Sequence, residues 1–129
     1  MKKEWQEAIK QDDLEKVRSL LEQGMDINAK DRYGQTALMN AAHAGQAELV
    51  RLLIENGAGL NVTAKYNLSA LMLALIGQHV EVARLLIEAG AEVNIRSSPH
   101  FYGRSALFLA EAGGHEEIAA LLKQKGATP

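Results

Sequence analysis

The sequence predicts an all-α solenoid, built from four helix–turn–helix units that are joined by hairpin-like turns. Three observations predict it: single residues recur at a fixed spacing, each period holds two helical segments, and the outermost units are polar where the inner ones are apolar. Gly24, Gly57 and Gly90 are 33 residues apart, and Gly126 follows after 36. Self-similarity at a period of roughly 20–50 residues is typical of repeat architectures.

The repeat register extends over the whole sequence. A Leu-Leu pair precedes each periodic glycine, and asparagine keeps the same period at Asn28, Asn61 and Asn94. Residues 31–63 and 64–96 are identical at 14 of 33 positions without a gap. We therefore predict a single domain over residues 1–129, divided into an N-terminal capping repeat (1–30), two inner repeats (31–63 and 64–96) and a C-terminal capping repeat with a three-residue insertion (97–129).

Each complete unit is predicted to begin with a short helix that a hydroxyl residue caps. Thr36, Ser69 and Ser105 each precede an Ala-Leu pair. A hydroxyl oxygen at this position can accept a backbone N–H that has no partner within the helix. Alanines follow inside these helices, and their small side chains let neighbouring helices approach closely.

A second, amphipathic helix is predicted in each unit, for example over Ala47–Glu55. Its acidic and basic residues lie three and four positions apart, which predicts an exposed face linked by ion pairs. Arg84 stands between Glu81 and Glu88 in the same pattern. The periodic glycine then ends the helix in the left-handed conformation, and an extended stretch with a tyrosine forms a tight turn.

The sequence resembles the ankyrin-repeat family over essentially its whole length. The family unit has about 33 residues and combines a β-turn, two helices and a Thr-Pro-Leu-His signature. Thr36-Ala37-Leu38-Met39 stands at that signature, so Ala and Met replace the family's Pro and His, and Leu52-Leu53, Gly57 and Asn61 follow in register. The resemblance implies a module whose protein partners contact the turn tips and the inner face of the first helices.

Polar residues are expected to close both ends of the solenoid, because nothing stacks beyond them. Lys16 and Ser19 stand where the later units carry aliphatic residues, and Glu111 and Lys123 depart from the apolar pattern in the last unit. Trp5 occupies the repeat position of a core leucine and is predicted to plug the N-terminal end. The alternative is an exposed tryptophan that binds a ligand.

The candidate partner-binding site lies on the tips and the adjoining inner helices. All three tyrosines of the chain occupy the same repeat position, one in each tip. Tyrosine often anchors interfaces because it offers a large, stiff ring with a polar group; the alternative is that each ring packs under its own turn. The predicted site residues are Arg32, Tyr33, Gln35, His43, Lys65, Tyr66, Leu68, Ile76, Arg96, Phe101, Tyr102 and Arg104.

The tips are also basic and partly apolar. Five cations stand there against one acid, which gives a local charge of +4 in a chain whose net charge is −2: Lys30, Arg32, Lys65, Arg96 and Arg104 against Asp31. Leu68 and Ile76 are large and apolar where neighbouring repeats carry polar or small residues, so with Tyr66 they predict an apolar patch, unless they are sporadic exposed residues. The longer turn, residues 97–102, is predicted to be a recognition loop, with a neutral insertion as the alternative. A partner with an acidic, partly apolar surface would be complementary.

Composition and motifs argue against several classes of function. The chain has no cysteine, which excludes disulfides and thiolate catalysis. There is no nucleophile elbow and no phosphate-binding loop, and the four histidines lack metal-ligand spacing. We therefore expect no enzyme activity, no cofactor and no metal. No apolar run approaches the roughly 20 residues of a membrane helix, and Met1–Glu7 lacks the apolar core of a signal peptide, so we expect a cytoplasmic protein.

The sequence thus predicts a monomeric, non-catalytic module that binds a protein partner. One alternative is an inhibitor or regulatory subunit that uses the same surface to occlude an enzyme's site. Another is a self-associating structural repeat protein. Nucleic-acid binding is the weakest alternative, because five dispersed tip charges in a chain of pI about 6.1 make a poor basic field.

Overall fold

The computed structural model describes residues 2–129 of the chain. Over this range the chain forms eight α-helices and two short 3₁₀ turns, with no β-strand and one isolated bridge between Arg96 and Ser105. The all-α prediction is therefore confirmed. In chain order the elements are α1 (Lys3–Lys10), α2 (Leu14–Glu22), α3 (Ala37–Ala44), α4 (Ala47–Glu55), η1 (Lys65–Asn67), α5 (Ala70–Ile76), α6 (Val80–Glu88), η2 (Pro99–Phe101), α7 (Ala106–Ala112) and α8 (Glu116–Gln124).

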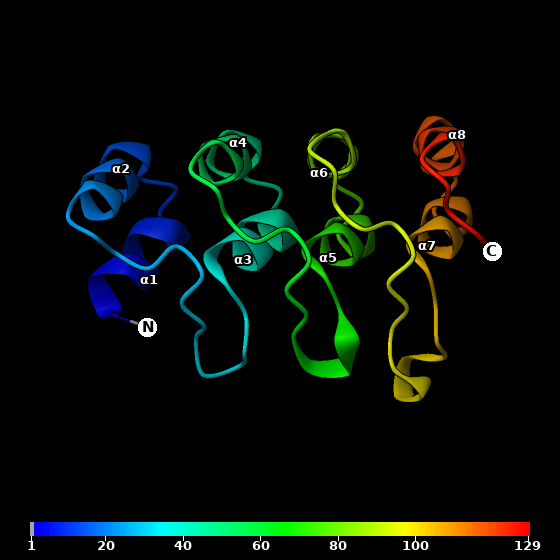
Figure 1. Ribbon diagram of the computed structural model, residues 1–129, viewed down its shortest axis with the longest axis horizontal. Coiled ribbons are helices and arrows are strands. Elements are labelled where there is room, and N and C mark those ends of the chain that lie inside the picture. The colour runs from blue at the N-terminus through cyan, green and yellow to red at the C-terminus, as the bar shows by residue number, and fades with distance from the viewer. Residues whose placement is uncertain (1) are drawn as a thin grey trace.

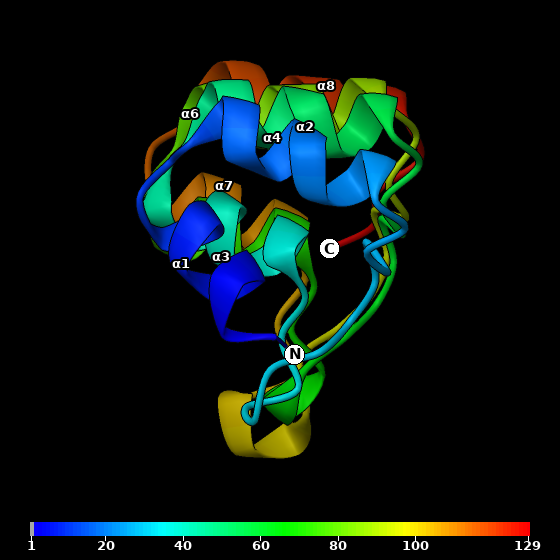
Figure 2. The same ribbon diagram turned by 90° about the vertical axis from the view of Figure 1, so that its left-hand side faces the viewer.

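The helices stack as a row of consecutive pairs (Figure 1). Viewed along the row, α1, α3, α5 and α7 form an inner layer, and α2, α4, α6 and α8 form an outer layer (Figure 2). The loops that join one pair to the next project together beyond the inner layer (Figure 2). None of the helices in residues 2–129 is both long enough and apolar enough to cross a membrane.

The predicted hydroxyl caps of the inner helices are confirmed. The side-chain oxygens of Thr36, Ser69 and Ser105 accept the backbone N–H three residues on, at 3.2–3.3 Å. At Thr36 the cap is reciprocal, because the Met39 sulfur lies 3.4 Å from the Thr36 backbone nitrogen. Each cap satisfies a donor that the helix cannot satisfy internally.

The predicted left-handed glycines are also confirmed at the ends of the outer helices. Gly24, Gly57, Gly90 and Gly126 have φ values between 82° and 98°. After α4, the Ala58 N–H donates to the Leu53 carbonyl and the Gly57 N–H to that of Ile54, at 3.0 Å each, which is the Schellman pattern of helix termination.

The periodic asparagines tie each unit to the next. Asn28 Oδ1 accepts the Gly59 N–H at 2.8 Å, and Asn61 Oδ1 accepts the Glu92 N–H at 2.7 Å. The Asn94 amide bonds the chain's last residues, accepting from the Thr128 N–H and donating to the Gly126 carbonyl. This role explains why asparagine shares the period of the glycines.

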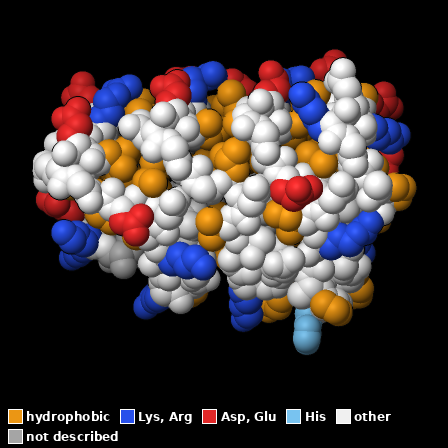
Figure 3. Space-filling model, viewed as in Figure 1, with side chains coloured by type: hydrophobic (Ala, Val, Ile, Leu, Met, Phe, Trp, Pro, Cys, Tyr) orange, Lys and Arg blue, Asp and Glu red, His pale blue; other side chains and the backbone are white. Residues whose placement is uncertain are grey.

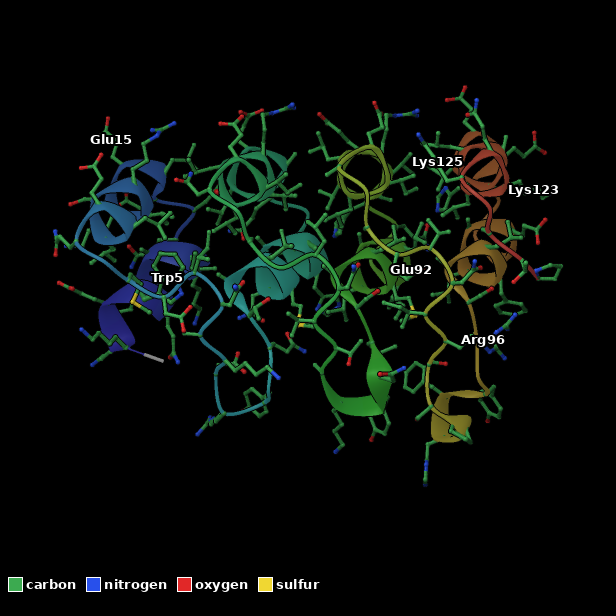
Figure 4. The ribbon with its side chains drawn as sticks, in the orientation of Figure 1. Trp5, Glu15, Glu92, Arg96, Lys123 and Lys125 are labelled. Atoms are coloured by element: carbon green, nitrogen blue, oxygen red, sulfur yellow. The ribbon has the colours of Figure 1, made fainter. Side chains whose placement is uncertain are left out.

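The core runs along the row between the two layers. Leu53 of α4 and Leu86 of α6 are fully buried at equivalent positions. Trp5 is fully buried at the position that leucine holds in the later units, so the predicted plug is confirmed (Figure 4). An exposed, ligand-binding tryptophan is thereby excluded.

Ion pairs occupy the outward faces of the two end units. Lys16 pairs with Glu4 at 3.5 Å at the N-terminal end, and Lys123 pairs with Glu111 at 3.5 Å at the C-terminal end. At the positions of Glu111 and Lys123, the preceding unit carries the buried residues Leu75 and Ile87.

The ion pairs of the outer layer differ in part from the expected pattern. Arg51 pairs with Glu48 in its own helix at 3.7 Å, as expected, but also approaches Glu81 of the next unit at 3.9 Å. Arg84 pairs with Glu117 of the next unit at 3.4 Å rather than with the acids of its own helix. Stacking brings α8 beside α6, and sequence spacing within one helix carries no information about that approach.

Candidate partner-binding groove

Three loops, here called the tips, end in turns of the same design: residues 31–35 in repeat 2 (31–63), residues 64–68 in repeat 3 (64–96) and residues 97–104 in repeat 4 (97–129). In each, the first residue donates its backbone N–H to the carbonyl of the last, at 2.9 Å: Asp31 to Gln35, Ala64 to Leu68 and Ser97 to Arg104. This shared bond makes the tips the hairpin-like turns that the sequence predicts. The three inserted residues of the last unit enlarge the third tip without changing how it closes.

The tip of repeat 2 is held by its own aspartate. Asp31 Oδ1 accepts the Tyr33 and Gln35 N–H groups at 2.8 and 3.0 Å, and Oδ2 accepts the Asn40 amide at 3.2 Å. The carboxylate is therefore engaged with the loop and with α3. These bonds fix the tip relative to its own inner helix.

The tip of repeat 3 is held by the following unit instead. Ala64 and Leu73 stand where repeat 2 has Asp31 and Asn40, so the aspartate clasp cannot form. The Tyr66 carbonyl accepts the Ser98 N–H at 2.7 Å, and the Asn67 amide donates to the Arg96 carbonyl at 2.8 Å. The tips of repeats 3 and 4 are thus joined.

The inserted segment of repeat 4 adds an aromatic contact to this join. Phe101 of η2 lies with its ring centroid 5.2 Å from that of Tyr66, at an interplanar angle of 33°. Neither a longer loop nor its aromatic content reveals this pairing in the sequence. The expectation that the loop takes part in recognition stays a prediction.

A groove of about 600 Å³ opens between the tip of repeat 2 and the joined tips of repeats 3 and 4. We call it the tip groove. It gathers nine of the twelve predicted site residues together with Leu73. Its lining residues are Arg32, Tyr33, Gln35, His43, Lys65, Tyr66, Leu68, Leu73, Ile76 and Phe101.

The groove has an apolar floor. Leu68 and Leu73 are buried there, and Ile76 at the end of α5 keeps 38% of its surface exposed. The sequence comparison that singles out Leu68 and Ile76 also contained the signal for Leu73, because Asn40 of repeat 2 is replaced there by leucine. Leu73 is nevertheless absent from the predicted site.

A histidine fixes the inner side of the groove. His79 Nε2 lies 3.0 Å from the His43 carbonyl oxygen and links the start of α6 to the end of α3. A Cβ placed on Gly45 or Gly77 would come within 2.5 or 2.7 Å of the His79 ring, so the ring fits only because both are glycine. The link ties the end of α3, which carries His43, to the segment that follows Ile76 of α5.

The rim of the groove is basic. The Arg32 guanidinium lies 5.1 Å from the centroid of the Tyr33 ring, and Lys65 Nζ lies 5.0 Å from that of Tyr66. Among the described residues that line the groove there is no acid. Acidic side chains lie along the outer layer among Lys and Arg, whereas the tip edge shows Lys, Arg and His together with apolar side chains (Figure 3).

Three predicted site residues lie outside the groove. Arg96 turns away from it and donates to the carbonyl oxygens of Gly103, at 3.3 Å, and Pro129, so it holds the loop and the last residues (Figure 4). Tyr102 remains 79% exposed, with Arg104 5.1 Å from its ring centroid. The Arg104 guanidinium also lies 4.3 Å from the centroid of the Phe108 ring.

The tip tyrosines do not pack under their turns. Tyr33, Tyr66 and Tyr102 keep 64%, 37% and 79% of their surfaces exposed. Tyr66 and Tyr102 also have left-handed backbones, with φ of 65° and 67°. That conformation is uncommon for a bulky residue and costs roughly 1–2 kcal/mol relative to the right-handed one.

These features define a class of protein: a helical repeat solenoid that offers a groove along one edge. Within residues 2–129 no group of three or more His, Cys, Asp or Glu side chains is placed to hold a metal ion. A family model for ankyrin repeats, in three copies, matches residues 5–97. The chain therefore belongs to the ankyrin-repeat family, whose members are generally protein–protein interaction modules and typically non-catalytic. A search of curated proteins finds no match to the chain.

Proposed function

We propose that this chain is a non-catalytic module that binds a partner protein through the tip groove and the exposed tip side chains beside it. The observation that carries the proposal is the groove itself, which joins an apolar floor to a basic rim. Preformed concave sites with an apolar lining and a few placed polar groups are the usual ligand sites of proteins. Arg96 belongs to the supporting structure of the tips in this proposal rather than to the contact surface.

The backbone of the tip tyrosines supports the same proposal. A strained conformation persists where the surrounding structure imposes it, and such residues cluster at functional sites. Tyr102 exposes most of its ring, so its side chain contributes little to the core. Asparagine or glycine would adopt this conformation at lower cost, which favours a role for the ring in binding.

A second candidate uses the same surface differently. An inhibitor or regulatory subunit would place these tips over the active site of an enzyme. The tips project beyond the inner layer, which suits insertion into a cleft (Figure 2). A partner that proves to be an enzyme, and loses its activity on binding, would decide for this candidate.

The proposal further includes a monomeric state and a cytoplasmic location. The four-unit division at residues 30/31, 63/64 and 96/97 also belongs to it. A self-associating structural protein remains the alternative to the monomer. Sedimentation velocity over a range of concentrations separates the two, because self-association increases the sedimentation coefficient as concentration rises.

Affinity capture from a lysate of the source organism tests the proposal. The tip variant is Tyr33→Ala with Tyr66→Asn and Tyr102→Asn, since asparagine tolerates the left-handed backbone. The matched control is Glu15→Ala with Glu55→Ala and Glu88→Ala, three exposed sites on the outer layer. Both variants must first unfold at the parent's temperature.

Proteins that the parent and the control capture, and the tip variant does not, would support the proposal. Equal capture by all three baits would place the binding surface away from the tips, and the outer layer would be the next surface to test. Capture by none of them would favour a structural role.

A further inference from the structure

We propose that the occupant of the tip groove is an acidic segment of the partner protein that inserts one bulky apolar side chain, with carboxylates on both sides of it. This inference rests on the proposed function and names the chemistry of the partner. It combines the shape of the groove with the charges at its rim.

The floor requires an apolar anchor. Leu68, Leu73 and Ile76 present aliphatic surface, and the Tyr66 and Phe101 rings form the wall on the side of the joined tips. Ile76 is 38% exposed, so part of this surface faces water until it is covered. Removing an apolar surface from water favours an aliphatic or aromatic side chain over a polar one.

The rim requires acids. Arg32 and Lys65 stand on opposite sides of the groove, each beside its own tyrosine. Neither forms an ion pair with a described residue, whereas the outer-layer arginines Arg51 and Arg84 are both paired. The groove is thus a cationic site in a chain whose net charge is −2. Such local complementarity selects a partner by charge sign and steers its approach.

The two sides of the groove are held independently. Asp31 clasps the tip of repeat 2, and hydrogen bonds from Ser98 and Asn67 join the tips of repeats 3 and 4. A groove whose walls are fixed before binding orders fewer groups on binding, which favours a short extended segment as the ligand.

Nucleic acid fits this groove less well than a peptide. A base could stack on an aromatic ring, but Tyr66 and Phe101 already pack against one another. Only two Lys or Arg side chains are among the described residues of the lining. Nucleic-acid affinity depends on many phosphate contacts and their counterions.

The test is selection of a random peptide library displayed on phage against the full chain. Enriched peptides are then synthesised with a fluorescein label and titrated by anisotropy. The variants are Ile76→Glu for the floor and Lys65→Glu for the rim. Lys125→Glu makes the same charge change as the rim variant, but beyond the end of α8 and far from the tips (Figure 4). Circular dichroism and melting confirm that each variant is folded.

We expect enriched peptides with one Trp, Phe, Leu or Ile between acidic residues. Replacing that residue by Ser should abolish detectable binding, as should Ile76→Glu. Lys65→Glu should weaken binding about tenfold, and Lys125→Glu by less than about twofold.

Enriched peptides without acids that still depend on Ile76 would overturn the inference and leave the proposed function standing. No enrichment, or binding that Ile76→Glu leaves unchanged, would also overturn it. If lysate capture is then insensitive to the tip variant as well, both proposals fail. If a single-stranded oligothymidylate binds more tightly than the enriched peptides, and its affinity falls steeply as salt is added, both proposals are overturned in favour of nucleic-acid binding.

Discussion

Tyr66 and Tyr102 show how the fold can hold a single residue in a backbone conformation that is unfavourable for its type. Both have left-handed backbones, whereas Tyr33 at the equivalent position does not and is followed by the left-handed Gly34. The tips thus place a tyrosine at the same point of the turn with different local geometry. What they share is an exposed ring with a cation from its own tip beside it.

Tyr102→Asn should leave stability within about 0.5 kcal/mol of the parent. The change removes an exposed contact with Arg104, worth roughly 0.5–1 kcal/mol, and relieves a backbone that asparagine adopts more easily. Denaturant unfolding measures the difference. Tyr33→Asn is the matched variant, and it gains no such relief because its backbone is not left-handed. A loss above about 1.5 kcal/mol for Tyr102→Asn would show that the ring is structural.

Leu53→Ala and Leu86→Ala should each lower the free energy of unfolding by about 2–5 kcal/mol. Both side chains are fully buried between the layers, so truncation leaves a cavity that a packed row can only partly close. Leu85→Ala is the matched control, because Leu85 is adjacent in sequence but only half-buried. Equal effects at Leu85 and Leu86 in urea unfolding would contradict the assigned core.

Hydrogen bonds between elements link successive units, in addition to the contacts of the core. The periodic asparagines accept hydrogen bonds from the loop that follows the outer helix of the next unit. His79 contacts the carbonyl at the end of α3, the inner helix of the preceding unit. These bonds cross the boundary between units, where a repeat array has only nearest-neighbour contacts to stabilise it. In the last unit, the effect of one such hydrogen-bonding residue, Asn94, can be measured by itself.

Asn94→Ala should destabilise the chain by about 1–2 kcal/mol, through the hydrogen bonds that it makes to Gly126 and Thr128. Hydrogen exchange should show lost protection at the Thr128 amide. Asn94→Asp keeps the acceptor for Thr128 and removes the donor to Gly126, so it should retain more of that protection. Unchanged exchange in Asn94→Ala would contradict the assigned role.

Sequence periodicity predicted what is local and missed what depends on how units stack. The Thr36 cap and the left-handed Gly57 follow from short-range patterns, and both are confirmed. The Arg84–Glu117 pair and the bond from Ser98 to the Tyr66 carbonyl cross from one unit to the next. Nothing in a single repeat records the angle and offset between neighbours.

The residues of the candidate site, like the fold, were predicted in part from the sequence. Comparison between repeats found most of the groove, because Tyr33 and Tyr66 recur at one repeat position and Leu68 and Ile76 stand where repeat 3 departs from repeat 2. Arg96 was included for its charge alone, yet its side chain bonds Gly103 and Pro129. Sequence gives the charge of a side chain but not its direction.

At the scale of the whole molecule, the ends differ from the interior in one respect. The ion pairs Glu4–Lys16 and Glu111–Lys123 lie where a stacked unit would need apolar surface. Exposed pairs of this kind add little stability, usually less than about 1 kcal/mol. Their consequence is for association, since charged side chains must lose water before another apolar surface can cover them.

Glu111→Leu combined with Lys123→Ile should therefore make the chain self-associate through its C-terminal end face. These are the residues that the preceding unit carries at the same positions, Leu75 and Ile87, where both are buried. The end face already has a hollow of about 380 Å³ lined by Glu111, His115 and Lys123, among others, so an apolar lining would invite a second copy.

Sedimentation velocity of the double variant should show a dimer whose fraction increases with protein concentration, because two identical end faces can pair about a two-fold axis. Glu15→Leu with Lys125→Ile is the matched control: it makes the same types of change at two exposed sites that do not form one end face. That control should sediment as the parent does. Association of the parent itself, or a double variant that stays monomeric at every concentration, would show that the charged end does not set the oligomeric state.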